Sequence, residues 1–160
     1  MRKRGKHFAG KNGIPARFRP EAVTQWRHTI DMQQGLDRDQ RDELERTVLV
    51  AFEALRTGKA NVDQFAKLEG AVELSGKLCA IGIGKEYADV VEQARVALER
   101  IKRRAATVGK FGIDGPATEP LRTALALHTE HLRTCARREV MEAVHSLERS
   151  TNRKEQHGIR

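Results

Sequence analysis

Two imidazoles and a thiol recur at helical spacing near the carboxyl end of the chain, at His128, His131 and Cys135. Steps of three and four residues place such side chains near one face of a helix, and with Cys79 they would supply the nitrogen and sulfur ligands that zinc prefers. The same positions also continue an apolar stripe, where a small thiol and a hydrogen-bonded histidine are ordinary core residues. No C-x-x-C or H-E-x-x-H pair is present. We therefore interpret these residues as core and predict no metal and no other cofactor.

A second segment, Gly-Ile-Gly-Lys at 82–85, resembles the end of a phosphate-binding loop. That loop needs a glycine five residues before its last glycine, and this position holds Cys79. It also needs Ser or Thr after the lysine, and this position holds Glu86. We predict a turn between two helices here instead.

The sequence predicts no enzyme. It contains no G-x-S-x-G motif, no catalytic Cys–His context and no carboxylates at metal spacing. The acidic pairs Asp37/Asp39 and Glu43/Glu45 fall in the early turns of a predicted helix, where they complement its dipole. Two cysteines without a secretory signal predict free thiols in a reducing cytoplasm.

The charge of the chain is concentrated at its ends. The 160 residues hold 30 Lys and Arg against 22 Asp and Glu, a formal charge of +8. Residues 1–20 carry +7 and no acid, residues 151–160 carry +2, and residues 21–150 carry −1. The basic residues of the first segment are Arg2, Lys3, Arg4, Lys6, Lys11, Arg17 and Arg19. A disordered basic arm of this kind fits non-specific contact with nucleic acid, and the alternative is a solubilising tail.

A second basic cluster lies near the end of the fourth predicted helix. Its members are Arg100, Lys102, Arg103 and Arg104, followed by Lys110. These cations are candidates for a second set of phosphate contacts. The alternatives are that they complement the carboxyl end of the helix or belong to a solvated, salt-bridged face.

The elements that must position these residues are helices. Periodicity and caps predict them over 20–34, from Asp37 to Gly58, from Asn61 to Gly82, over 85–108 and over 118–150. Gln40 and Gln64 complete capping boxes for the second and third. The predicted core positions include Leu44, Val48, Ala51 and Leu55; Phe65, Leu68, Val72, Leu78, Cys79 and Ile81; Tyr87, Val91, Ala94, Leu98 and Ile101; and Leu121, Leu125, Leu132, Val140, Ala143 and Leu147.

Short loops between the middle helices predict antiparallel neighbours. The fold class is therefore all-α, an antiparallel helical bundle of four to five helices with flexible basic termini. We divide the chain into a disordered basic arm at 1–19, a bundle at 20–150 and a basic tail at 151–160. No apolar run approaches the roughly 18 residues of a membrane span, so we predict no membrane contact and a cytoplasmic protein.

The opening Met-Arg-Lys-Arg-Gly-Lys-His at 1–7 and the segment Ile-Gly-Lys-Glu-Tyr-Ala-Asp-Val-Val at 83–91 carry a resemblance. The chain resembles a group of small uncharacterised proteins of proteobacterial phages and other mobile elements. The resemblance implies a mobile-element origin, a helical body and a bacterial cytoplasmic setting. It implies no activity.

Three functions follow as hypotheses. The first is a non-enzymatic phage or mobile-element accessory protein that contacts nucleic acid through its basic arm. The second is a protein-binding module, such as an inhibitor or adaptor acting on a host defence complex, for which Trp26, Leu74 and Leu127 are apolar residues off the main stripes. The third is a structural homo-oligomer.

Overall fold

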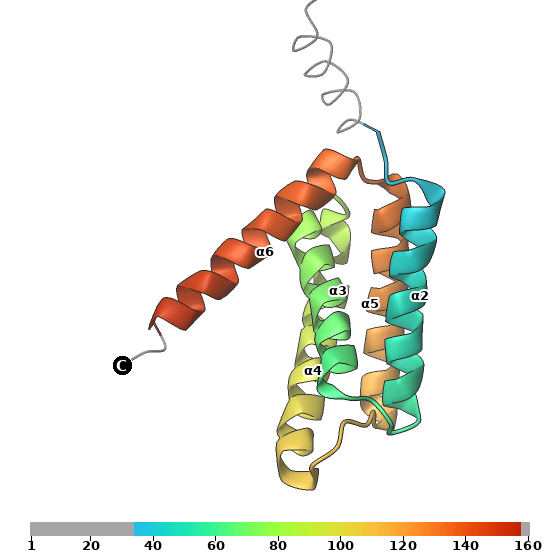
Figure 1. Cartoon of the computed structure of the whole chain (residues 1–160), viewed down its shortest axis with the longest axis vertical. Helices are drawn as coiled ribbons and strands as arrows, with labels where there is room; N and C mark the ends of the chain where they lie inside the picture. Colours follow the sequence, from blue (N-terminus) through green and yellow to red (C-terminus); the bar gives the residue numbers. More distant parts are fainter. Residues whose placement is uncertain (1–33, 158–160) are drawn as a thin grey trace, which may run out of the picture.

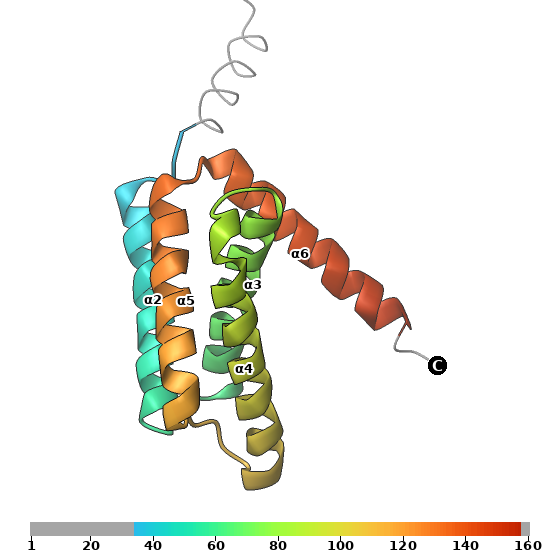
Figure 2. The ribbon, with the colours of Figure 1, turned by 180° about the vertical axis from the view of Figure 1, so that it is seen from behind.

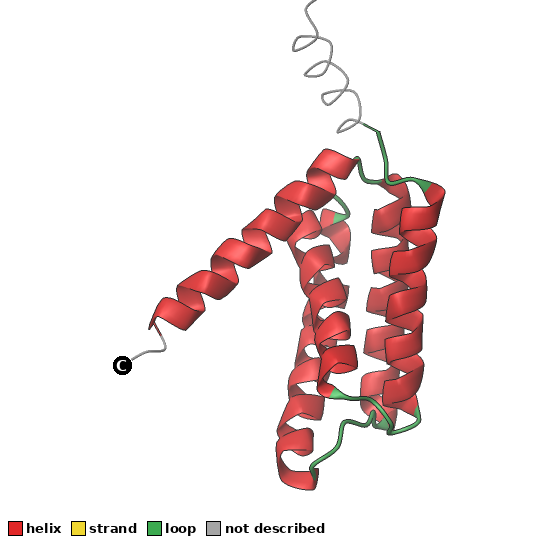
Figure 3. Cartoon of the chain, in the orientation of Figure 1, coloured by secondary structure: helices red, strands yellow, loops and turns green. Residues whose placement is uncertain are grey.

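The computed structural model describes residues 34–157, and the side chains of residues 34–150. The helices are α2 (Arg38–Arg56), α3 (Val62–Ala80), the short 3-10 helix η2 (Lys85–Tyr87), α4 (Ala88–Val108), α5 (Gly115–Thr134) and α6 (Arg137–His157). Consecutive helices from α2 to α5 run antiparallel and pack as a bundle, while α6 crosses α3 and projects away from it (Figure 1). All of these elements are helical (Figure 3), so the predicted all-α antiparallel bundle is confirmed.

The local signals at the ends of α2 and α3 act as predicted. Asp37 accepts a hydrogen bond from the Gln40 backbone N–H at 2.8 Å, and Asn61 accepts one from Gln64 at 2.8 Å. In both boxes the glutamine side chain accepts from the cap residue in return. Gly58 follows α2 with a φ of 68°, in the left-handed region that glycine enters without steric cost.

The core consists of two clusters. The main cluster joins α2, α3, α4 and α5 through residues that include Leu55, Phe65, Leu68, Val72, Val91, Leu98, Ile101 and Leu121. A smaller cluster fastens the first half of α6 to α3 through Leu78, Cys135, Val140 and Ala143. Leu74 and Leu127, which the sequence placed off the main stripes, are half-buried and pack against these clusters.

The two ends of the bundle differ in construction (Figure 2). At one end the turn 81–87 joins α3 to α4, and Cys135 and Ala136 join α5 to α6; we call this the junction end. Gly35 pairs there with Ala136 in an isolated antiparallel bridge. At the other end the loop 109–114 joins α4 to α5, beside the basic cluster of α4; we call this the cationic end. There the ring of Phe111 stacks on Phe65, with centroids 4.6 Å apart.

The largest departure from prediction concerns the last helix. We expected one helix over 118–150, but the chain forms α5 and α6 with a break at Cys135, whose ψ of 143° is extended. Two contacts hold the break open. The Arg137 backbone N–H donates to the Gln34 carbonyl at 2.7 Å, and the Glu139 carboxylate accepts from the Ala136 N–H at 2.7 Å. A contact with a segment about a hundred residues earlier in the chain therefore overrides the local helical pattern.

Smaller departures occur at element ends. The fifth helix begins at Gly115, capped by Asp114, rather than near residue 118. Three predicted core residues are exposed: Leu44 at 43%, Ile81 at 48% and Tyr87 at 48%. Tyr87 precedes α4 as its cap residue, because the 3-10 turn η2 replaces the first turn of the helix predicted from residue 85.

The predicted termini fall largely outside this description. The arm at 1–19 and the helix at 20–34 lie outside it, except Gln34, which forms a bend. Residues 151–157, which the sequence assigned to a basic tail, continue α6 to its end at His157. They contain no Gly or Pro, and the first helix-breaking residue after them is Gly158. None of the helices described here has the length and apolar character needed to cross a bilayer.

Candidate functional site

The basic cluster of α4 lies along its second half, at the cationic end of the bundle, and most of its members are already paired. Arg100 Nη2 lies 3.2 Å from a carboxylate oxygen of Asp114, the cap residue of α5. Lys102 Nζ lies 3.3 Å from Glu69 on α3. Both pairs therefore join α4 to a neighbouring element, and both are half-exposed or more on the basic side.

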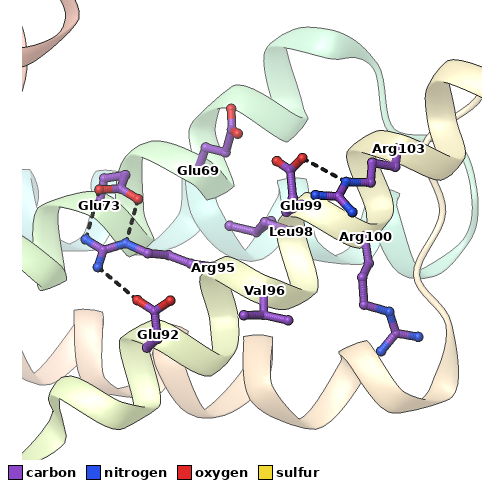
Figure 4. Close-up of a pocket in the computed structure, with 9 residues that line it drawn as sticks. All are labelled: Glu69, Glu73, Glu92, Arg95, Val96, Leu98, Glu99, Arg100 and Arg103. Carbon is purple, nitrogen blue, oxygen red and sulfur yellow. Dashed lines mark hydrogen bonds and ion pairs between the residues drawn. The ribbon is translucent and has the colours of Figure 1, made fainter.

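Arg103 pairs within its own helix. Its Nε lies 3.1 Å from the Glu99 carboxylate one turn earlier, and Figure 4 shows this contact with the Arg100 side chain pointing away from it. Arg104 and Lys110 are exposed, and neither makes an ion pair with any residue in the described part of the chain. The α4 cluster therefore offers an outside anion fewer free cations than its sequence suggests.

An ion-paired groove of about 410 Å³ runs between α3 and α4 beside this cluster. Arg95 is its central cation (Figure 4) and makes two hydrogen bonds to the Glu73 carboxylate, at 2.8 and 3.0 Å. A weaker contact reaches Glu92 at 3.4 Å. The hydrogen bonds that Arg95 donates to Glu73 raise the pKa of the Arg95 guanidinium, which stays charged. The groove is thus lined by mutually compensated charges.

The helix dipole does not account for the α4 cluster. The last turn of α4 contains no basic residue, and the dipole effect fades within one turn of the helix end. The partners of the cluster are instead the carboxylates of Glu69, Glu99 and Asp114. The interpretation as a solvated, salt-bridged face therefore describes Arg100, Lys102 and Arg103, three of the four cations of the cluster.

The arm residues predicted to bind nucleic acid lie outside the described part of the chain. They are Arg2, Lys3, Arg4, Lys6, Lys11, Arg17 and Arg19. The residues that the structure brings together are therefore those of α4 and its partners alone.

The junction end buries the two histidines considered as metal ligands. His128 is 4% exposed, and its Nδ1 lies 3.4 Å from the hydroxyl of Ser75 on α3. The pKa of His128 is lowered from 6.5 to about 4. Burial is the larger cause, and the neighbouring His131 is the second. The ring is therefore neutral at pH 7.

His131 is 2% exposed, and burial lowers its pKa as well, opposed in part by the backbone of Ile83. Neither ring nitrogen reaches hydrogen-bond geometry with a described protein atom. The ring lies against Gly84, where an added Cβ would stand 2.7 Å from His131 Nε2. Gly84 also has a φ of 67°, so both its backbone and its surroundings favour glycine.

Both cysteines are free and buried, which confirms the predicted unpaired thiols. Cys79 donates to the Gly84 carbonyl at 3.2 Å, and burial raises its pKa. Burial also raises the pKa of Cys135 to about 11. Within residues 34–150, no three or more His, Cys, Asp and Glu side chains converge in an arrangement that could hold a metal ion. The burial of all four side chains supports the interpretation of these residues as core.

Sequence reasoning missed Glu69 and Asp114 as partners of the α4 cluster. Asp114 carried a local signal, since an Asp before Gly-Pro is a favourable helix cap, and it accepts from the Ala117 N–H at 3.0 Å. No local sequence signal identifies Glu69 as a partner, because it lies 33 residues from Lys102 and contacts it only through the packing of α3 on α4.

The fold and the charged surface define a small all-α bundle with one ion-paired, cation-bearing end. Comparison of the chain with known protein families, curated proteins and solved structures found no match.

Proposed function

We propose that this protein contacts nucleic acid without sequence specificity, through its basic amino-terminal arm, while the bundle serves as a folded anchor. The observation that carries the proposal is the distribution of charge. Residues 34–150 contain 19 Lys and Arg and 19 Asp and Glu, so the bundle has no net charge. The excess lies in residues 1–33, with +6, and in residues 151–160, with +2. Attraction to a polyanion must therefore come mainly from the ends of the chain.

The ion pairs of α4 strengthen this division. A cation that already contacts a carboxylate gains less from a phosphate, because the freed carboxylate then repels the same phosphate. Arg100, Lys102 and Arg103 are in this position. Arg104 and Lys110 are the α4-side residues that remain available, and we assign them a secondary role in binding.

The test is the salt dependence of binding to a short DNA duplex. If the seven arm cations neutralise phosphates, log K falls against log salt with a slope of about −6. A variant with all seven replaced by Gln keeps the chain length and should lose most of this slope. The matched control replaces Arg100, Lys102 and Arg103, three cations of the bundle, and should leave the slope nearly unchanged.

Three results would decide against the proposal. One is wild-type binding without salt dependence. Another is equal affinity and slope in the arm variant and in wild type, which would remove the arm from the interface. The third is a loss of slope confined to Arg104→Gln/Lys110→Gln, which would move the interface to the bundle.

A further inference from the structure

The face between α2 and α5 carries an apolar groove of about 270 Å³ that none of the described residues fills. Its wall is apolar at Val48, Leu49, Phe52, Leu125 and Ala126, and its rim holds Glu45, Arg122 and Thr129. Figures 1 and 2 both show α2 and α5 side by side along this face. Leu49 is 61% exposed and its neighbour Val50 is 56% exposed, so this side of α2 presents large apolar side chains to whatever covers it.

The chain enters the bundle at one end of this groove. Gln34 and Gly35 are held beside the end of α5, because the Arg137 N–H donates to the Gln34 carbonyl and Gly35 pairs with Ala136. The described part of the chain therefore begins at the junction end, where α2 begins and α5 ends. A segment that turned back from this point would meet the groove between those two helices directly.

The segment 20–33 has the pattern and the length to fit the groove. Val23, Trp26 and Ile30 fall on one face of a helix, and Pro20 suits its first turn. At 1.5 Å per residue, 14 residues span about 21 Å, so a helix running from the junction end would reach roughly the level of Ala51 on α2.

The same spacing sets the register of the segment against α2. Counted from Gln34 beside Asp37, Trp26 comes level with about Glu45, and Val23 level with about Val48. Arg27 flanks the apolar face and comes level with Glu45 on the rim, whose carboxylate already lies 3.4 Å from Arg133 Nε. The match between the segment and the groove therefore rests on the apolar residues.

We propose that residues 20–33 of this chain lie as a helix in the α2–α5 groove, antiparallel to α2, with the apolar face formed by Val23, Trp26 and Ile30 against the groove. The segment then completes the bundle as a fifth helix in contact with Leu49 and Phe52. It also starts the basic arm partway toward the cationic end of the bundle. Only this last consequence depends on the proposed nucleic-acid function.

Trp26 is the only tryptophan, so the intact protein reports on the groove without a label. In the wild-type chain, we expect blue-shifted Trp fluorescence that is protected from acrylamide. Leu49→Lys places a charge in the groove at an exposed position, which spares the core. It should shift the emission to the red and raise the quenching constant several-fold, with the bundle still folded by circular dichroism.

The matched control is Val96→Lys. Val96 is 55% exposed on α4, outside the α2–α5 groove, so this variant should keep the wild-type emission. Solvent-exposed emission from the wild-type protein would overturn the proposal. So would protected emission that Leu49→Lys leaves unchanged.

Other occupants of the groove give different results. If a second copy fills it, the protein sediments as a dimer and Trp26 becomes exposed on dilution, which contradicts the proposal. If a separate protein fills it, Trp26 is exposed in the purified chain, which also contradicts it. A protected Trp26 in a monomer supports it. Because no nucleic acid is present, failure here is distinct from failure of the proposed function, which the salt titration measures.

Discussion

The junction end and the cationic end of the bundle use polar residues in opposite ways. At the junction end, His128 and His131 are buried, and burial lowers the pKa of both. At the cationic end, charged side chains stay at the surface and pair with carboxylates, as Arg100 does with Asp114. Polar groups in the first environment affect folding stability strongly, because burial removes their water. Those in the second affect it weakly, because water screens exposed ion pairs.

Two glycines give the largest expected difference between the ends. Gly84 at the junction end and Gly58, where α2 ends at the cationic end, have nearly equal φ values of 67° and 68°. An added Cβ at Gly84 meets His131 Nε2, whereas one at Gly58 meets nothing within 4 Å. Gly84→Ala should lower the free energy of unfolding by about 4 kcal/mol, from backbone strain and overpacking together. Gly58→Ala should cost only the strain, about 1 to 2 kcal/mol.

Urea denaturation of both variants measures this difference. Because Gly58→Ala carries the same backbone strain, it is the control for the contact with His131. Equal losses in the two variants would show that the junction end is no tighter than the cationic end.

The second largest effect is expected from acid, which should lower the free energy of unfolding by protonating a buried histidine of the junction end. The pKa of His128 is about 4 in the folded protein and 6.5 ordinarily, so the unfolded chain takes up the proton first as pH falls. The stabilisation from the neutral ring is complete above pH 6.5, declines below it and is lost near pH 4. This stabilisation amounts to up to about 3 kcal/mol.

Urea denaturation at a series of pH values should show this fall in the free energy of unfolding. The control His145→Gln, at an exposed position of α6, should show the same fall. A flat profile between pH 6.5 and 4.5 would contradict the buried, neutral state of His128.

Local sequence signals were sufficient for much of the fold. Asp37 with Gln40 and Asn61 with Gln64 specified two helix starts, because a capping box depends on residues three apart. Gly58 marked a helix end, because glycine alone adopts its positive φ without steric cost and no distant contact is needed.

The break at Cys135 could not be predicted in this way. It depends on Gln34 and Gly35, which reach it only in the folded protein. Two local hints existed. Glu139 lies three residues after Ala136, at capping distance, and the apolar positions step by five residues from Cys135 to Val140. Despite that step, we predicted one continuous helix over 118–150.

The candidate site was predicted in its cations and missed in their partners. The basic residues of α4 are visible in the sequence as a cluster, but their free charge depends on where carboxylates from other helices lie. Lys102 meets Glu69 only because α3 packs along α4. Tertiary packing therefore decides how much of a sequence-level charge cluster is available for binding.

A smaller effect is expected at Asp114, which has two roles at the cationic end. Its carboxylate caps α5 by accepting from the Ala117 N–H at 3.0 Å, and it pairs with Arg100 at 3.2 Å. Asp114→Ala should lower the free energy of unfolding by about 1 kcal/mol, mostly through the lost cap. Asp114→Asn keeps a capping oxygen and removes the charge, so it should cost less than about half of that. If the two variants lose equal stability, the ion pair rather than the cap is the stabilising contact.

The smallest stability effect is expected where the effect on binding is of most interest. Glu69→Gln/Glu99→Gln removes the carboxylate partners of Lys102 and Arg103, two exposed pairs whose loss should change the free energy of unfolding by under about 1 kcal/mol. If the carboxylates of Glu69 and Glu99 limit phosphate binding by Lys102 and Arg103, the freed cations should strengthen DNA binding and steepen the salt slope by up to about −2.

The control Glu43→Gln/Glu53→Gln removes two acids of α2 that pair with arginines of the same helix. It changes the net charge by the same amount, away from α4. An equal gain in both variants would assign the effect to net charge. A gain confined to Glu69→Gln/Glu99→Gln would show that these pairs limit the cations of α4. No gain in either variant would exclude Lys102 and Arg103 from the contact and leave it to the arm with Arg104 and Lys110.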